Sequence, residues 1–156
     1  MFPPNFITVE RTRSHLDIGS KKRVLQQLGE LLASGAPGLD AEEVFDHLLE
    51  RERLGSTGLG HGIALPHARA AQVDQAVGAF VQLKQGVDFD AMDDQPVDLA
   101  FGLLVPQNAT EEHLQLLAGL ASMFSDPALC DKLRSGGSAE QLLQHIQAWN
   151  PQANTG

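Results

Sequence analysis

Cysteine is nearly absent from the 156-residue chain, which contains only Cys130. A single cysteine cannot form an intrachain disulfide, so a hydrophobic core has to hold the fold together. We expect Cys130 to be a small buried residue within a helix. The low cysteine content fits a protein of the reducing cytoplasm.

Long apolar runs are also absent, because none approaches the roughly 20 residues that a membrane-spanning helix requires. The start of the chain, Met1–Asn5, has no basic region followed by an apolar core, which argues against a secretory signal. We therefore expect a cytoplasmic protein without membrane insertion.

Basic residues are few: 11 Lys and Arg stand against 20 Asp and Glu, for a formal net charge of −9. This balance argues against a general binder of nucleic acids or anionic membranes, because both need a basic face. The one basic cluster, Lys21–Arg23, is expected to lie on a solvated face at the start of a helix.

The length and composition indicate one globular domain over residues 1–156, large enough to bury a full core without disulfides. We expect irregular structure from Met1 to about Ser14 and a loose polar tail over residues 150–156. Helical periodicity and capping residues predict helices at about Lys21–Ser34, Ala41–Arg51, Glu111–Ser125 (capped by Thr110), after Asp126-Pro127 and after Ser138. Apolar runs predict strands at 63–66, Val77–Leu83 and Val97–Val105, and Val87–Asp90 can form a short edge strand. Helices interleaved with buried strands favour an α/β layered domain, with a strand order that the pattern leaves open.

His67 is the first candidate for chemistry. Pro66 cannot donate to a central strand ladder, so the strand should end there and leave His67 in a loop at the strand end, where α/β folds place their sites. The preceding glycine-rich stretch can present backbone and hydroxyl donors to an anion, and its candidate phosphate-binding residues are Ser56, Thr57 and Gly58. An ordinary flexible connection explains the same stretch, which lacks the lysine of a P-loop.

His113 and Arg51 are the supporting candidates. His113 lies in the first turn of a helix that follows the most apolar strand, where the helix dipole attracts phosphate and lowers the pKa of a histidine. Arg51 directly precedes the glycine-rich stretch and can bind phosphate oxygens. A surface histidine and a helix C-terminal arginine remain alternative interpretations of these two residues. Phosphoryl transfer between histidines needs no metal or cofactor, so none is expected.

The stretch Leu49–Arg69, LERERLGSTGLGHGIALPHAR, resembles the active-site signature of fructose/mannitol-type enzyme IIA domains of the phosphotransferase system, most closely their nitrogen-regulatory branch. The segments Leu104–Pro106 and Thr110–Leu114 resemble the second site segment of that family. The likeness extends from about Ser20 to Trp149, and residues before Ser20 match nothing recognisable. His61 is not carried over, because some relatives have asparagine there.

The resemblance implies a mixed, mostly parallel sheet covered by helices on both faces. It also implies that His67 accepts a phosphoryl group from an HPr-like histidine phosphocarrier, and that His113 and Arg51 support the phosphorylated state. Since the chain contains neither a permease segment nor a second sugar-specific domain, a regulatory phosphotransferase is favoured over sugar uptake. The downstream regulatory targets are not named by the sequence.

Three alternatives remain open. His61, His67 and His113 could together hold a zinc ion with an open position, as in a metalloenzyme. The chain could be a sugar-uptake enzyme IIA that serves a separate permease. It could also be a relative that binds partner proteins without being phosphorylated.

Overall fold

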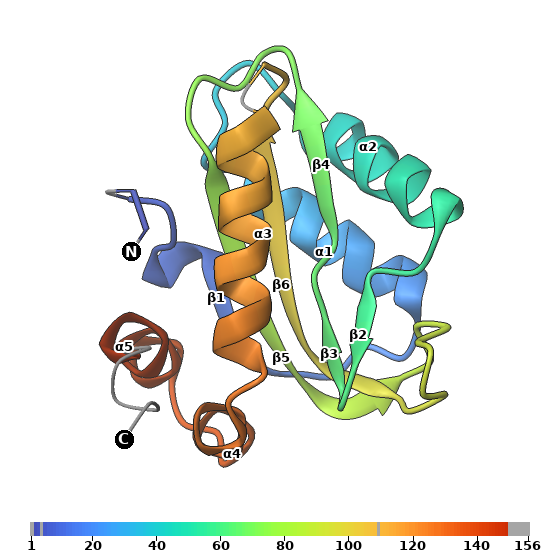
Figure 1. Ribbon diagram of the computed structural model, residues 1–156, viewed down its shortest axis with the longest axis vertical. Coiled ribbons are helices and arrows are strands. Elements are labelled where there is room, and N and C mark those ends of the chain that lie inside the picture. The colour runs from blue at the N-terminus through green and yellow to red at the C-terminus, as the bar shows by residue number, and fades with distance from the viewer. Residues whose placement is uncertain (1, 4, 109, 150–156) are drawn as a thin grey trace.

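The structure, a computed structural model, describes residues 2–3, 5–108 and 110–149. A mixed sheet forms its centre, and helices cover both faces (Figure 1). The strands are β1 (Thr12–Leu16), β2 (Gly58–Gly60), β3 (Ile63–Ala64), β4 (His67–Ala70), β5 (Val77–Val87) and β6 (Val97–Pro106). The α-helices are α1 (Lys21–Ala33), α2 (Ala41–Leu54), α3 (Thr110–Phe124), α4 (Pro127–Arg134) and α5 (Ala139–Ala148), and a short 3-10 helix, η1 (Val9–Arg11), precedes β1.

Strand β6 is the centre of the sheet. The strand order is β1-β5-β6-β3-β2, and β4 also pairs with β6. β6 runs antiparallel to β5 and parallel to β3 and β4, whereas β1 is parallel to β5 and β2 is antiparallel to β3. β6 is buried along most of its length, as its apolar run predicts. The predicted α/β class with a mixed, mostly parallel sheet is confirmed.

Two apolar clusters lie on opposite faces of the sheet. Helices α1 and α2 contribute to one cluster, and helices α3, α4 and α5 contribute to the other (Figure 1). Cys130 is buried in α4, and its thiol donates to the carbonyl of Phe124 at 3.2 Å, which confirms its expected place. Within the described part of the chain, no helix has both the length and the apolar character needed to cross a membrane.

The predicted helix starts are confirmed at four positions. The Ser20 hydroxyl accepts from the backbone N–H of Arg23, and the aspartate of Asp126-Pro127 caps α4. Asp40 and Ser138 each form a reciprocal capping box, with Glu43 and Gln141 respectively. Helix α3 begins at Thr110, one residue earlier than predicted.

The expectation of irregular structure up to about Ser14 was wrong. Phe6 and Ile7 are buried, η1 follows, and β1 begins at Thr12 and pairs with the distant strand β5. The strand was missed because its residues, Thr-Arg-Ser-His-Leu, are mostly polar. β1 lies at the edge of the sheet, where several side chains reach solvent, and only the pairing with β5 makes it a strand. Residues 150–156, the predicted polar tail, lie outside the described residues.

Two further strand predictions are corrected. β5 continues beyond Leu83 to Val87, and residues 88–90 form a loop rather than an edge strand. The loop is nevertheless anchored, because Phe89 is fully buried. The glycine-rich stretch is not a continuous loop either, since it contains β2 and the turn that leads into β3.

Candidate functional site

His67 begins strand β4 instead of lying in a loop after a strand, so its predicted position was wrong. β3 ends at Ala64, Leu65 and Pro66 interrupt the ladder, and β4 then resumes parallel pairing with β6, where His67 lies opposite Leu103. Pro66 does stop one strand, as expected, but its carbonyl accepts from the backbone N–H of Leu103 at 2.9 Å and keeps the chain on the sheet. His67 is thus held by a strand, which orients its side chain more firmly than a loop would.

The imidazole of His67 is fixed through its Nδ1 atom. Nδ1 lies 2.7 Å from the carbonyl oxygen of Leu65. A carbonyl can only accept a hydrogen bond, so Nδ1 must be the protonated nitrogen of the neutral ring. The lone pair then lies on Nε2, which is the nitrogen available as a nucleophile.

His113 lies beside His67. It is the fourth residue of α3, and it is only 5% exposed. The centroids of the two imidazole rings are 5.2 Å apart, and the rings are tilted by 50° relative to each other. The pKa of His113 is lowered to about 4, mainly by burial and to a smaller extent by the charges of His67, Arg69 and Arg51. The ring is therefore neutral at neutral pH, as the sequence predicts, although burial contributes most to the shift.

The pKa of His67 is also lowered. Burial is the largest cause, and the nearby Arg51 and Arg69 act in the same direction. The hydrogen bond to Leu65 and the negative charge of Glu52 oppose this shift. Both histidines therefore tend toward the uncharged form, which is the form in which an imidazole nitrogen can attack.

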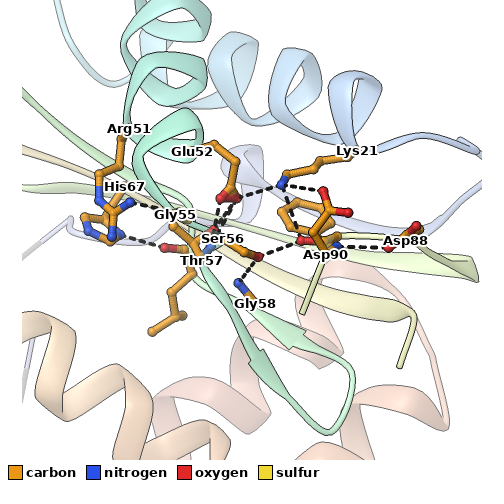
Figure 2. A network of polar contacts seen from close by, with 12 residues as sticks. Lys21, Arg51, Glu52, Gly55, Ser56, Thr57, Gly58, His67, Asp88 and Asp90 are labelled. Carbon is orange, nitrogen blue, oxygen red and sulfur yellow. Dashed lines mark hydrogen bonds and ion pairs between the residues drawn. The ribbon is translucent and has the colours of Figure 1, made fainter. Parts of the chain in front are cut away.

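An open pocket of about 480 Å³ surrounds the two histidines. Helix α2, strand β4 and helix α3 supply its lining, which comprises His47, Glu50, Arg51, Leu54, His67, Ala68, Arg69 and His113. Arg51 donates from Nη1 to the carbonyl of Gly55 at 2.9 Å, and Figure 2 shows its guanidinium beside His67. Two arginines and two neutral histidines thus give this pocket a cationic character suited to a phosphoryl group.

The structure does not bring Ser56, Thr57 and Gly58 to the pocket. The Ser56 hydroxyl donates to the carbonyl of Phe89 at 2.6 Å and accepts from the N–H of Gly58 (Figure 2). Thr57 is buried, and both its backbone N–H and its hydroxyl donate to the carboxylate of Glu52. These donors already have partners within the fold, so the three residues are not grouped with the histidines.

His61 also lies apart from the other two histidines. It occupies the turn between β2 and β3 with a positive φ of 57°, and the carboxylate of Asp93 accepts from its backbone N–H. A different pocket contains His61, together with residues such as Asp98 and Arg134. The three-imidazole zinc site is therefore not formed, and no group of three metal-ligating side chains occurs among the described residues.

Several pocket residues escaped the sequence analysis. Arg69 follows His67 by two positions, and successive side chains of a strand point to opposite faces, so the two residues share one face. This spacing is informative only when residues 67–70 are known to form a strand. His47, Glu50 and Leu54 follow one another at spacings of three and four positions, so they share one face of α2, and Arg51 lies four positions after His47 at the side of that face. Glu52 and Lys21 were missed as well, because their importance depends on contacts distant in sequence.

The α/β domain thus places two adjacent histidines, both with a lowered pKa, in a pocket that also contains two arginines, and a pocket of this class suits an anionic group such as a phosphoryl group. Comparison with known proteins specifies the family. The chain belongs to the phosphoenolpyruvate-dependent sugar phosphotransferase system EIIA 2 family, whose pattern matches residues 5–149. The match begins well before Ser20, so the earlier residues are part of the family domain, contrary to the sequence-based expectation.

Similar proteins support the nitrogen-regulatory branch. A nitrogen regulatory protein of Pseudomonas aeruginosa is 48% identical over 140 residues, covering 90% of this chain and 91% of that protein. The crystal structure of the nitrogen regulatory protein IIA-Ntr from Neisseria meningitidis superposes with a TM-score of 0.86 at 43% identity, covering 90% and 96% of the two chains. IIA mannitol from Escherichia coli superposes with a TM-score of 0.75 at 27% identity, covering 89% and 97%. The predicted family and its branch are confirmed.

Proposed function

We propose that this protein is a regulatory phosphohistidine carrier of the nitrogen-related phosphotransferase system. In this proposal, Nε2 of His67 accepts a phosphoryl group from the phosphohistidine of an HPr-like carrier protein. The observation that carries the proposal is the hydrogen bond between Nδ1 of His67 and the Leu65 carbonyl, which leaves Nε2 as the nucleophilic nitrogen.

The chemistry balances without a cofactor. A nitrogen–phosphorus bond forms at Nε2 of His67 while the equivalent bond in the donor breaks, and the donor histidine keeps the electron pair of that bond. Such a transfer has a loose transition state with charge spread over the equatorial oxygens, so catalysis depends on positioning and on positive charge. Phosphorylation leaves Nδ1 protonated, and the Leu65 carbonyl then stabilises the resulting cationic ring.

Arg51, Arg69 and His113 surround the phosphoryl group in this proposal. The two guanidinium groups line the same pocket as His67, and each can donate to a phosphoryl oxygen. His113 remains neutral because of its low pKa, so it can donate one N–H without adding a full charge. Ser56, Thr57 and Gly58 have other hydrogen-bond partners, and the proposal does not require them.

The regulatory role is supported by the relatives named nitrogen regulatory proteins. A carrier of this kind releases no product, so its output is the charge state of His67. Phosphorylation changes the surface charge that partner proteins contact at the pocket. Leu54, which is 85% exposed at the pocket edge, and Leu114, exposed on α3, provide apolar surface for such partners. A cytoplasmic location is part of the proposal, since the HPr-like phosphocarrier that donates the phosphoryl group acts there.

The decisive experiment incubates the protein with a phosphorylated HPr-like donor. Acid-labile phosphate should appear in the wild type and be absent from His67→Ala, with folding checked by circular dichroism. His61→Ala is the matched control, because this exposed histidine lies outside the pocket, and it should be labelled like the wild type. Labelling that survives His67→Ala would refute the assignment.

Sugar uptake with a separate permease remains the second candidate, and the likeness to IIA mannitol favours it. The two candidates differ in what happens after His67 is phosphorylated. Transfer from the phosphorylated protein to a sugar-specific IIB domain would support uptake. Retention of the phosphoryl group in the presence of such a domain would support the regulatory role.

A further inference from the structure

Glu52 is a buried carboxylate beside the proposed site. It lies in the last turn of α2, adjacent in sequence to Arg51, and its side chain is only 3% exposed. One carboxylate oxygen accepts from the Thr57 backbone N–H and the other from the Thr57 hydroxyl, both at 2.7 Å, and Lys21 Nζ lies 3.7 Å away (Figure 2). A buried carboxylate costs free energy unless it is well paired, and these donors provide that pairing.

The hydrogen bonds to Thr57 close a loop that holds both reactive side chains. Within the loop, the carbonyl of Gly55 accepts from Arg51 Nη1 at 2.9 Å. At its end, the carbonyl of Thr57 accepts from the backbone N–H of Leu65 at 3.0 Å. The carbonyl of Leu65 in turn accepts from Nδ1 of His67. Glu52 is thereby connected to the guanidinium on one side and to the imidazole on the other.

Apolar packing contributes little to holding this loop in place. Residues 53–56 are exposed, so apolar packing does not determine their position. The hydroxyl of Ser56 supplies a second anchor through the Phe89 carbonyl, but that bond faces away from the pocket. Three anchors therefore place the Gly55 and Thr57 carbonyls: the Ser56 hydroxyl, the bond from the Leu65 N–H to the Thr57 carbonyl, and the Glu52 carboxylate, which binds Thr57 through two hydrogen bonds.

We propose that Glu52 is a positioning residue for phosphoryl transfer: its buried carboxylate holds Thr57, and through the 55–57 loop it holds the Arg51 guanidinium and the Nδ1–H form of His67 in their reactive arrangement. The inference rests on the proposed function and deepens it. Glu52 does not touch the phosphoryl group. Its effect is to keep Nε2, rather than Nδ1, facing the donor.

A purely structural role is the competing explanation, in which Glu52 only completes an ion pair with Lys21. The variants Glu52→Gln and Glu52→Ala separate the two. Glutamine keeps an oxygen that can accept from Thr57 but removes the charge, whereas alanine removes both. Glu42→Gln is the matched control, because it removes one carboxylate from an exposed position of the same helix.

The first measurement is the initial rate of phosphorylation by the HPr-like donor at equal concentrations of folded protein. Loss of orientation by about 1 Å can cost about 100-fold in rate, so a loss of that order is expected for Glu52→Ala. Glu52→Gln should recover most of the rate, and Glu42→Gln should match the wild type. A wild-type rate in Glu52→Ala, or an equal loss in the alanine and glutamine variants, would overturn the proposal.

The second measurement does not depend on phosphorylation. The 15N resonances of the His67 ring report its tautomer, and the wild type should show protonated Nδ1. Glu52→Ala should show a mixture of both tautomers, and an unchanged spectrum would contradict the positioning role. If the wild type itself is not phosphorylated, the proposed function fails while these spectra still test Glu52.

A folding defect in Glu52→Ala would not leave the proposal untested. Thr57→Val then takes its place, because it removes the hydroxyl donor to Glu52 while leaving both the carboxylate and the backbone bond. A slower rate and a partial change of His67 tautomer are expected. A wild-type rate in this variant would contradict the proposal.

Discussion

Acidification should destabilise this fold through His113. Burial, together with the neighbouring positive charges, lowers the pKa of the ring from 6.5 to about 4 in the folded protein, whereas the unfolded chain keeps the ordinary value. Between these two values the unfolded state binds more protons than the folded state, so the stability contributed by neutral His113 is complete above pH 6.5 and is lost as the pH falls toward 4. The pKa of His67 is lowered too, and it acts with the same sign.

The magnitude follows from the linkage relation. A difference of about 2.5 pKa units corresponds to about 3 kcal/mol when the loss is complete, and to about 2 kcal/mol at pH 5. Because His113 is almost fully buried, solvent screening does not reduce this figure appreciably.

The assay is denaturant unfolding of the wild type and His113→Gln at pH 7 and pH 5. Glutamine is polar and does not titrate, so the loss of free energy of unfolding between the two pH values should be about 2 kcal/mol smaller in the variant. Contributions from other titrating groups occur in both proteins and cancel in this difference. An NMR titration of the His113 ring gives an independent check. Equal pH dependence in both proteins, or a midpoint near 6.5 for His113, would refute the reasoning.

Three further predictions concern the pocket and the core. The rate of phosphorylation should be constant above neutral pH and fall only below pH 6.5, because the lowered pKa of His67 keeps its Nε2 atom unprotonated. A pH profile with a midpoint above 7 would contradict this. Arg51→Lys should slow phosphoryl transfer about 10-fold or more, because a lysine cannot donate two parallel hydrogen bonds to the phosphoryl group. Stopped-flow or quench-flow labelling would measure the rate, and Arg53→Lys, at a nearby exposed position, is the control. Phe6→Ala should lower the free energy of unfolding by about 3–5 kcal/mol, because Phe6 is 1% exposed and its ring stacks on Phe101. A loss below about 1 kcal/mol in denaturant unfolding would show that the N-terminal segment is not part of the core.

Local signals predicted most of the helices and the central strand. Apolar periodicity and capping side chains act within one or two turns, so the starts of α1, α2 and α5 were predicted correctly from neighbouring residues alone. The continuous apolar run of β6 likewise predicted a strand buried on both faces. These features depend on the backbone close to each residue and need little information from the rest of the chain.

The strands at the sheet edge and around the site were harder to predict. β1 and β4 are short and largely polar, and each forms because a distant strand offers hydrogen-bond partners. The same dependence hid Arg69, whose place in the pocket follows from the alternation of β4. It also hid Glu52, which reads as one more charged residue of a helix until Thr57 and Lys21 are seen beside it.

His67, His113 and Arg51 were identified as candidates from the sequence, through the proline before the first, the helix start around the second and the helix end at the third. Only the tertiary structure decided how they are arranged. Folding brings α2, β4 and α3 to one pocket, buries His113 so that its pKa falls, and directs Nδ1 of His67 to the carbonyl of Leu65. Tautomer, burial and charge depend on groups far apart in the chain, so the sequence determined which residues are available, whereas their packing determined which nitrogen is available to react.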